Sequence, residues 1–79
     1  MRILFFAQAR DATGTAEWEM TVSANLNADD LWRELAAKFP KLAVLRKITR
    51  LARNGEYTDE HTSFSNTDEV ALIPPVSGG

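Results

Sequence analysis

The 79-residue chain contains no cysteine, one histidine, four glycines and three prolines. Without cysteine it has no disulfide framework, no thiolate nucleophile and no cysteine-based zinc site. The apolar run at the N-terminus, residues 3–7, is too short for the core of a signal peptide and far below the roughly 20 residues of a membrane span. We therefore expect a cytoplasmic protein with neither a metal site nor a membrane segment.

Composition and size favour a small folded domain. Hydrophobic residues make up 44% of the chain and charged residues 25%, which is ordinary for a globular protein. A domain of this length buries only about 60% of the surface that its unfolded chain exposes. Because so small a domain rarely holds a complete active site, we expect a carrier, a binding module or a subunit that is not catalytic on its own. The net charge of -2 argues against a dedicated nucleic-acid binder.

Two strands are predicted near the N-terminus. Residues 3–7 are apolar at successive positions, which indicates a central strand covered on both faces. Residues 17–22 alternate between polar and apolar side chains, as in a half-buried antiparallel strand. We expect residues 10–14 to form a loop in which Gly14 is the turn residue, so that the two strands make a hairpin.

One helix is clearly signalled. Asn27 is a good N-cap, and two aspartates follow in what would be the first turn, where the helix dipole favours negative charge. An apolar face recurs at four-residue steps, at Leu31, Leu35 and Phe39. Pro40 cannot continue the helix, which should therefore end near Phe39.

The second half predicts three more strands. Residues 41–47 are expected to form an irregular connector, and residues 50–53 a strand. Asn54-Gly55 is a strong hairpin signal, and residues 56–58 would return from that turn. The last strand is expected at residues 69–73, which are mostly apolar.

These elements predict an α+β protein with the β-grasp (ubiquitin-like) fold. Its mixed sheet would have four to five strands, with one main helix packed on one face. The first and last strands are the most apolar, so we expect them to lie centrally and to pair in parallel. A ferredoxin-like sandwich is the alternative, but the second helix that it requires is hard to find. We expect residues 1–73 to form the domain and residues 74–79 a flexible tail.

The last six residues, Pro-Pro-Val-Ser-Gly-Gly, suggest a projecting arm. The prolines stiffen an extended base, and glycine has no Cβ, so its backbone enters channels that a side chain would block. Such an arm could carry the terminal carboxylate into the active site of another protein. The carboxylate would need activation by an ATP-dependent partner, because this chain has no P-loop. The alternative is an ordinary frayed terminus.

Both ends of the chain resemble one family. The opening Leu-Phe-Phe-Ala-Gln-Ala-Arg at residues 4–10 and the ending from Asp68 to Gly79 are similar to the small, sulfur-carrier subunit of molybdopterin synthase. This resemblance implies a β-grasp fold and a C-terminal glycine that is adenylated and then thiocarboxylated. The sulfur would pass to cyclic pyranopterin monophosphate, forming the molybdopterin dithiolene in molybdenum cofactor biosynthesis.

The resemblance also implies partners. They are the large synthase subunit, with which the family forms a heterotetramer, an adenylating enzyme similar to ubiquitin-activating enzymes, and a sulfur donor protein. ATP would be used by the activating partner, and this chain would bind no cofactor. The chain would thus be the small subunit of a sulfurtransferase complex.

Site residues follow from the matched positions. Gly79 matches the acceptor of AMP and then of sulfur, and Gly78 its slender neighbour. The tail inserted into the partner would comprise Pro74, Pro75, Val76, Ser77 and Gly78. Phe6 and Ile73 match apolar contacts to partners, although the family often has phenylalanine at the position of Ile73.

Other interpretations stay open. A carrier for thiazole synthesis would share the two glycines, and a ubiquitin-like module that binds partners noncovalently would not need them. Five of the nine basic residues lie within residues 41–53. Because no aromatic residues are interleaved with them, a solvated face is favoured over a nucleic-acid site, and an acidic patch on a protein partner is a further alternative.

Overall fold

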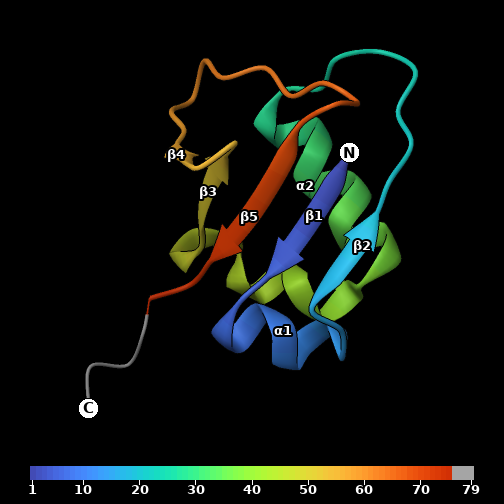
Figure 1. Cartoon of the computed structure of the whole chain (residues 1–79). Helices are drawn as coiled ribbons and strands as arrows, with labels where there is room; N and C mark the ends of the chain where they lie inside the picture. The colour runs from blue at the N-terminus through green and yellow to red at the C-terminus, as the bar shows by residue number, and fades with distance from the viewer. Residues whose placement is uncertain (76–79) are drawn as a thin grey trace.

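The structure, a computed structural model, describes residues 1–75. Five strands form one mixed sheet in the order β2-β1-β5-β3-β4, and α2 packs across one of its faces (Figure 1). The strands are β1 (Arg2–Phe5), β2 (Glu17–Glu19), β3 (Arg50–Arg53), β4 (Glu56–Tyr57) and β5 (Glu69–Ile73). The helices are α1 (Ala7–Thr13), α2 (Ala28–Lys38) and the 3-10 helix η1 (Pro40–Ile48). This is the predicted β-grasp architecture.

The central pair of strands is β1 and β5, which run parallel as predicted. Ile3 lies opposite Val70, and Phe5 lies opposite Leu72. These four side chains are at most 2% exposed and point toward α2. Because alternate residues of a strand face opposite sides, the residues between them lie on the other face of the sheet.

The predicted hairpin at Asn54-Gly55 is confirmed. It joins β3 to β4, and both turn residues have positive φ, 51° at Asn54 and 88° at Gly55. Two positive φ values in a two-residue loop are the signature of a type I′ turn, whose twist matches that of the strands.

The predicted N-cap of α2 is also confirmed. The side chain of Asn27 accepts a hydrogen bond from the backbone N–H of Asp30 at 2.8 Å. The helix ends at Lys38, just before Pro40 as predicted, and buries Leu31, Trp32 and Leu35 against the sheet.

The segment between β1 and β2 is not the predicted loop. Residues 7–13 form α1, which buries Ala9 completely, and Gly14 ends it with φ of 74° as a left-handed C-cap. Gly14 is therefore not the predicted turn residue of a hairpin loop; a glycine after a run of good helix formers is also a typical C-terminal signal of a helix. The strand that follows alternates as predicted, but its ladder covers only Glu17–Glu19.

The predicted irregular connector at 41–47 is also wrong, because η1 spans Pro40–Ile48. A 3-10 helix has three residues per turn, so residues three apart align along it. Leu42 is fully buried and Leu45 is half-buried at that spacing. A three-residue apolar period was therefore present in the sequence and marks the inner side of η1.

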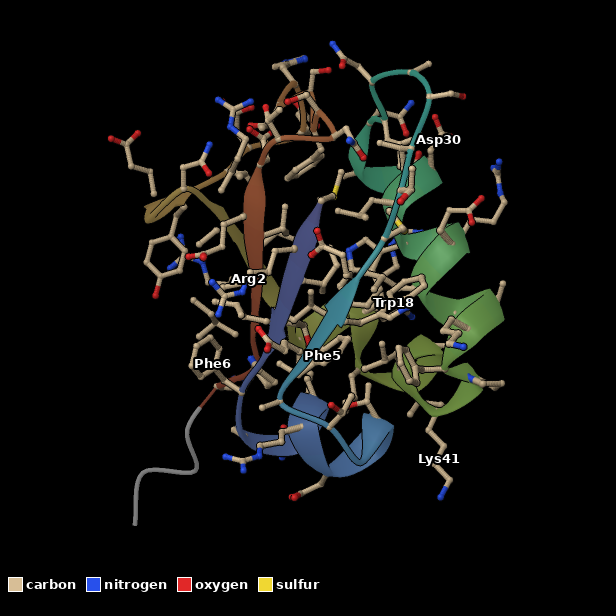
Figure 2. All side chains as sticks on the ribbon, turned by 45° about the vertical axis from the view of Figure 1, so that its right-hand side comes forward. Arg2, Phe5, Phe6, Trp18, Asp30 and Lys41 are labelled. Carbon is tan, nitrogen blue, oxygen red and sulfur yellow. The ribbon has the colours of Figure 1, made fainter. Side chains whose placement is uncertain are left out.

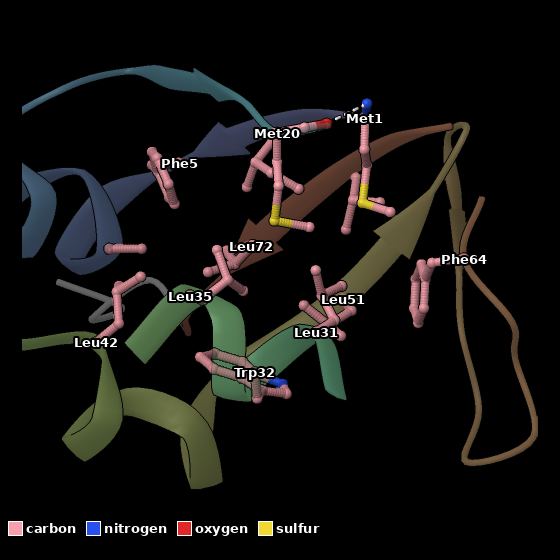
Figure 3. Packing of buried hydrophobic residues seen from close by; sticks show 13 residues of the cluster. Met1, Phe5, Met20, Leu31, Trp32, Leu35, Leu42, Leu51, Phe64 and Leu72 are labelled. Atoms are coloured by element: carbon pink, nitrogen blue, oxygen red, sulfur yellow. Dashed lines mark hydrogen bonds between the residues drawn. The ribbon is translucent and has the colours of Figure 1, made fainter. Parts of the chain in front are cut away.

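Phe64 anchors the long polar segment before β5. It is completely buried, and its backbone exchanges two hydrogen bonds of 2.8 Å with Leu26. Figure 3 shows Phe64 at one end of the core, near Met1 and Leu51. The amino group of Met1 donates to the backbone oxygen of Met20 at 2.6 Å, which ties the start of β1 to the end of β2.

Candidate functional site

The face of the sheet opposite α2 carries a row of mostly apolar side chains. Leu4 lies beside Ala71 in the parallel pair, Ala71 lies opposite Ala52, and Ala52 lies opposite Tyr57. The row therefore crosses four neighbouring strands at one level. No helix of residues 1–75 packs on this face (Figure 1).

The two alanines make the row concave. Their small side chains lie between the larger Leu4 and Tyr57, which leaves a shallow groove about 350 Å³ in volume. We call this surface the open sheet face, defined by Leu4, Phe6, Ala52, Tyr57, Ala71 and Ile73. Tyr57 is 57% exposed and Phe6 48%, so apolar area faces solvent here.

The prediction that β1 is covered on both faces is wrong. Ile3 and Phe5 are buried, whereas Leu4 is only half-buried and Phe6 is exposed. The two faces of β1 are apolar for different reasons. One face packs in the core, and the other forms part of the open sheet face. Exposed apolar surface of this kind marks interaction sites more often than it serves stability.

Phe6 and Ile73, expected to contact a partner, lie on the same surface. Both line the groove, and the backbone N–H of Phe6 donates to the oxygen of Leu72 at 3.3 Å, so the chain follows β5 to its end. Figure 2 shows Phe6 beside the point where the C-terminal segment leaves the sheet. The open sheet face therefore leads directly to the base of the C-terminal segment.

The base of that segment is partly packed. Pro74 is under 2% exposed, whereas Pro75 is exposed. Side-chain packing thus continues one residue past β5, and Pro74 fixes where the chain leaves the domain. The predicted tail residues Val76, Ser77, Gly78 and Gly79 lie outside the described residues.

Charges are arranged unevenly along the open sheet face. At its far end Arg2 binds Glu17 at 2.8 Å and Glu69 at 3.3 Å. The hydrogen bond that Arg2 donates to Glu17 raises the pKa of the Arg2 guanidinium, and the charges of Glu17 and Glu69 add to this effect. At the end nearer Pro74, Arg50 lies opposite Ile73, and its guanidinium is 3.8 Å from the centre of the Tyr57 ring. The apolar row is thus bordered at one end by an ion-paired cluster with more acidic than basic groups and at the other end by a cation.

Among residues 1–75 no group of three or more His, Cys, Asp or Glu is placed to hold a metal ion. None of the helices in this part of the chain is long and apolar enough to cross a membrane. Sequence reasoning found Phe6 and Ile73 but missed Leu4, Ala71 and Tyr57. For Leu4 and Ala71 the signal was the alternation within β1 and β5, which becomes informative only when the covered face of the sheet is known.

Comparison with known proteins agrees with this architecture. The model of the ThiS family matches residues 3–79. The molybdopterin synthase sulfur carrier subunit of Arabidopsis thaliana is 37% identical over 79 residues, which cover all of this chain and 82% of the relative.

Two solved structures share the fold. SAMP1 from Haloferax volcanii superimposes with a TM-score of 0.82 at 26% identity, over all of this chain and 98% of that one. A chain in the complex of subunits 1 and 2 of the molybdopterin-converting factor of Helicobacter pylori gives 0.67 at 20% identity, over 99% and 96% of the two chains. With a family model that spans nearly the whole sequence and a relative of this similarity, the chain belongs to the ThiS family of ubiquitin-like sulfur carriers.

Proposed function

We propose that this protein is the sulfur-carrier subunit of a molybdopterin synthase. The observation that carries the proposal is its 37% identity, along its whole length, to a relative of that name. The same similarity favours this role over that of a thiazole-type carrier. The open sheet face supports the proposal, because it offers a partner an apolar surface that ends at the base of the C-terminal segment.

In this proposal the reacting group is the carboxylate of Gly79. An oxygen of the carboxylate attacks the α-phosphate of ATP on an adenylating partner, and pyrophosphate leaves. A sulfide equivalent from a donor protein then displaces AMP and leaves a thiocarboxylate. In the large subunit, the thiocarboxylate sulfur attacks a carbon of cyclic pyranopterin monophosphate and displaces an oxygen leaving group. Water then cleaves the acyl C–S bond, which leaves the sulfur on the pterin and restores the carboxylate of Gly79. The arm contributes proximity, because it holds the nucleophile at the reacting carbon.

The proposed partners follow from this sequence of reactions. The large synthase subunit is supported by the fold shared with a chain in the complex of subunits 1 and 2 from Helicobacter pylori. The adenylating enzyme and the sulfur donor are required because both ATP chemistry and sulfur must come from outside this chain. We place these reactions in the cytoplasm.

The decisive experiment is intact mass spectrometry. Full-length protein is incubated with the cognate adenylating enzyme, ATP and a sulfur donor, and an exchange of one oxygen for sulfur at Gly79 is expected. A variant lacking Gly79 should show no sulfur transfer to cyclic pyranopterin monophosphate in the large subunit, because its terminal carboxylate reaches about 3.5 Å less far. The matched control is Ser77→Thr, which keeps the length. Absence of the exchange in the full-length protein would refute the proposed role.

A noncovalent ubiquitin-like module remains the competing function, and the same variants separate the two. Such a module would bind its partner equally well with and without Gly78 and Gly79. The carrier proposed here would lose its sulfur transfer while its thermal unfolding stays unchanged, because the terminal residues of a domain generally contribute little to its stability.

A further inference from the structure

The basic residues of this chain are gathered in one region that the proposed function does not use. Residues 38–53 contain six of the nine Lys and Arg and no Asp or Glu. All eleven acidic residues lie elsewhere in the chain. In a protein with a net charge of -2, these cations therefore follow one another in the sequence along the end of α2, η1 and β3, with no carboxylate side chain between them.

The geometry of η1 aligns three of its exposed side chains. With three residues per turn, positions three and six apart stack in one row. Lys41, Val44 and Lys47 occupy such a row and are all exposed, Val44 by 83%. A neighbouring row packs inward through the buried Leu42 and the half-buried Leu45, which fixes the orientation of η1. We call Lys41, Val44 and Lys47 the basic ridge.

The two lysines of the basic ridge are not explained by ion pairs within residues 1–75. The third cation of η1, Arg46, forms an ion pair with Asp29 of α2. Neither Lys41 nor Lys47 forms an ion pair with another residue of the described part of the chain. In Figure 2, Lys41 points away from the domain, well apart from Phe6. Val44 adds almost nothing to the core at its exposure, so the ridge is not explained by stability.

We propose that the basic ridge is a second docking surface, which binds an acidic surface of the protein that takes up the C-terminal arm. This inference rests on the proposed function and adds the recognition chemistry of its partner. At about 2 Å rise per residue, the two lysines are roughly 12 Å apart along the helix. The complementary surface would therefore place carboxylates about that far apart, with an apolar side chain against Val44 between them.

A protein surface fits better than a nucleic acid. An exposed valine in the centre of the ridge prefers an apolar contact, and no aromatic side chain on the ridge could stack on bases. The excess acid elsewhere on the chain would also repel a polyanion that extended beyond the ridge.

The ridge lies close in the chain to the end of the sheet from which the arm departs. After Lys47 the chain passes into β3, where Arg50 lies directly opposite Ile73, one residue before Pro74. A partner that takes up the arm is thus in reach of the basic residues that follow the ridge. Contacts at the basic ridge and at the base of the arm would together fix the direction in which the arm enters the partner. The exposed charges of the ridge would also speed the association of the two proteins.

The test uses the full-length protein with the cognate large subunit and, separately, the cognate adenylating enzyme. Binding is measured by biolayer interferometry at low and at physiological salt. The double variant Lys41→Gln/Lys47→Gln should bind at least one partner about three- to tenfold more weakly at low salt, as expected for two exposed ion pairs, and should show a weaker salt dependence. Val44→Ser should weaken the same complex with the salt dependence unchanged.

The matched control is Ser23→Glu/Ala24→Glu, which lowers the net charge by the same amount at exposed positions before α2. If the ridge variants bind both partners as this control does, the inference is overturned while the proposed function stands. If the unmodified protein binds neither partner, both fail. If the ridge variants lose binding only to a labelled DNA duplex and bind both proteins normally, the basic ridge is a nucleic-acid site and the inference is overturned.

Discussion

The side-chain amide of Asn54 donates to Oδ1 of Asp68 at 3.0 Å, which joins the β3–β4 turn to the residue before β5. The Oδ1 atom of Asn54 also accepts from the backbone N–H of Glu69 at 2.9 Å. One turn residue thus adopts positive φ, closes the hairpin and holds the start of the strand that leads to the C-terminal segment.

Replacing Asn54 by alanine should lower the free energy of unfolding by about 2 kcal/mol. Alanine is strained at positive φ and makes neither side-chain hydrogen bond. Asn54→Gly should recover part of the loss, because glycine accepts the φ but cannot bind Asp68. Urea unfolding measures both, with Asn25→Ala, at an exposed loop position, as the control. Equal stability of all three variants would contradict this account of Asn54.

The stability of the domain should fall in acid partly through Asp68. A hydrogen bond from the backbone N–H of Ser65, helped by the amide of Asn54, lowers the pKa of the Asp68 carboxyl below its ordinary value of 3.8. The stabilisation is therefore complete above the unfolded-state pKa and is lost as the pH falls through the lower folded-state pKa. Stability measured from pH 6 downward should fall less in Asp68→Asn than in the unmodified protein.

The matched control for this pH series is Asp11→Asn. Asp11 is an exposed carboxylate of α1 for which the described residues provide no hydrogen bond. Its variant should follow the unmodified protein more closely than Asp68→Asn does. The same acid dependence in both variants would mean that Asp68 has no special part in it.

Phe64→Ala should cost about 3–5 kcal/mol, the usual cost of removing a buried aromatic ring. Phe64 is completely buried and anchors the polar segment to Leu26. A domain of this size has about 5–10 kcal/mol in total, so Phe64→Leu is the informative companion if the alanine variant does not fold. Urea midpoints should decrease from the unmodified protein through leucine to alanine, with Val44→Ala as an exposed control. A leucine variant as unstable as alanine would show that ring volume is not the determinant.

Phe6→Asp should weaken binding of the cognate large subunit by roughly ten- to hundredfold. It removes an apolar contact from the proposed interface, next to the base of the C-terminal segment, and adds a charge there. Its free energy of unfolding should change by about 0.5 kcal/mol or less, because Phe6 is 48% exposed. Thr21→Asp adds the same charge at an exposed position after β2. Equal affinities of the two variants, measured by titration calorimetry, would exclude the open sheet face as the docking surface.

Local signals in the sequence predicted those elements that depend on neighbouring residues. Asn27 and Pro40 bound α2, and Asn54-Gly55 specifies its turn, because capping and positive φ are properties of a few adjacent residues. Local signals were ambiguous where one residue type is compatible with two kinds of local structure. Gly14 is suited to a turn and to a helix C-cap, and only the burial of Ala9 favours the helix.

The sequence alone determined that this is a small β-grasp domain whose first and last strands are its most apolar, and its motifs pointed to a sulfur carrier. Tertiary structure alone decided which apolar residues remain exposed. Phe5 and Phe6 are adjacent and chemically identical, but one is buried under α2 and the other lies on the open sheet face. Alternation along a strand separates the two rings, and the face that is covered depends on where a distant helix packs.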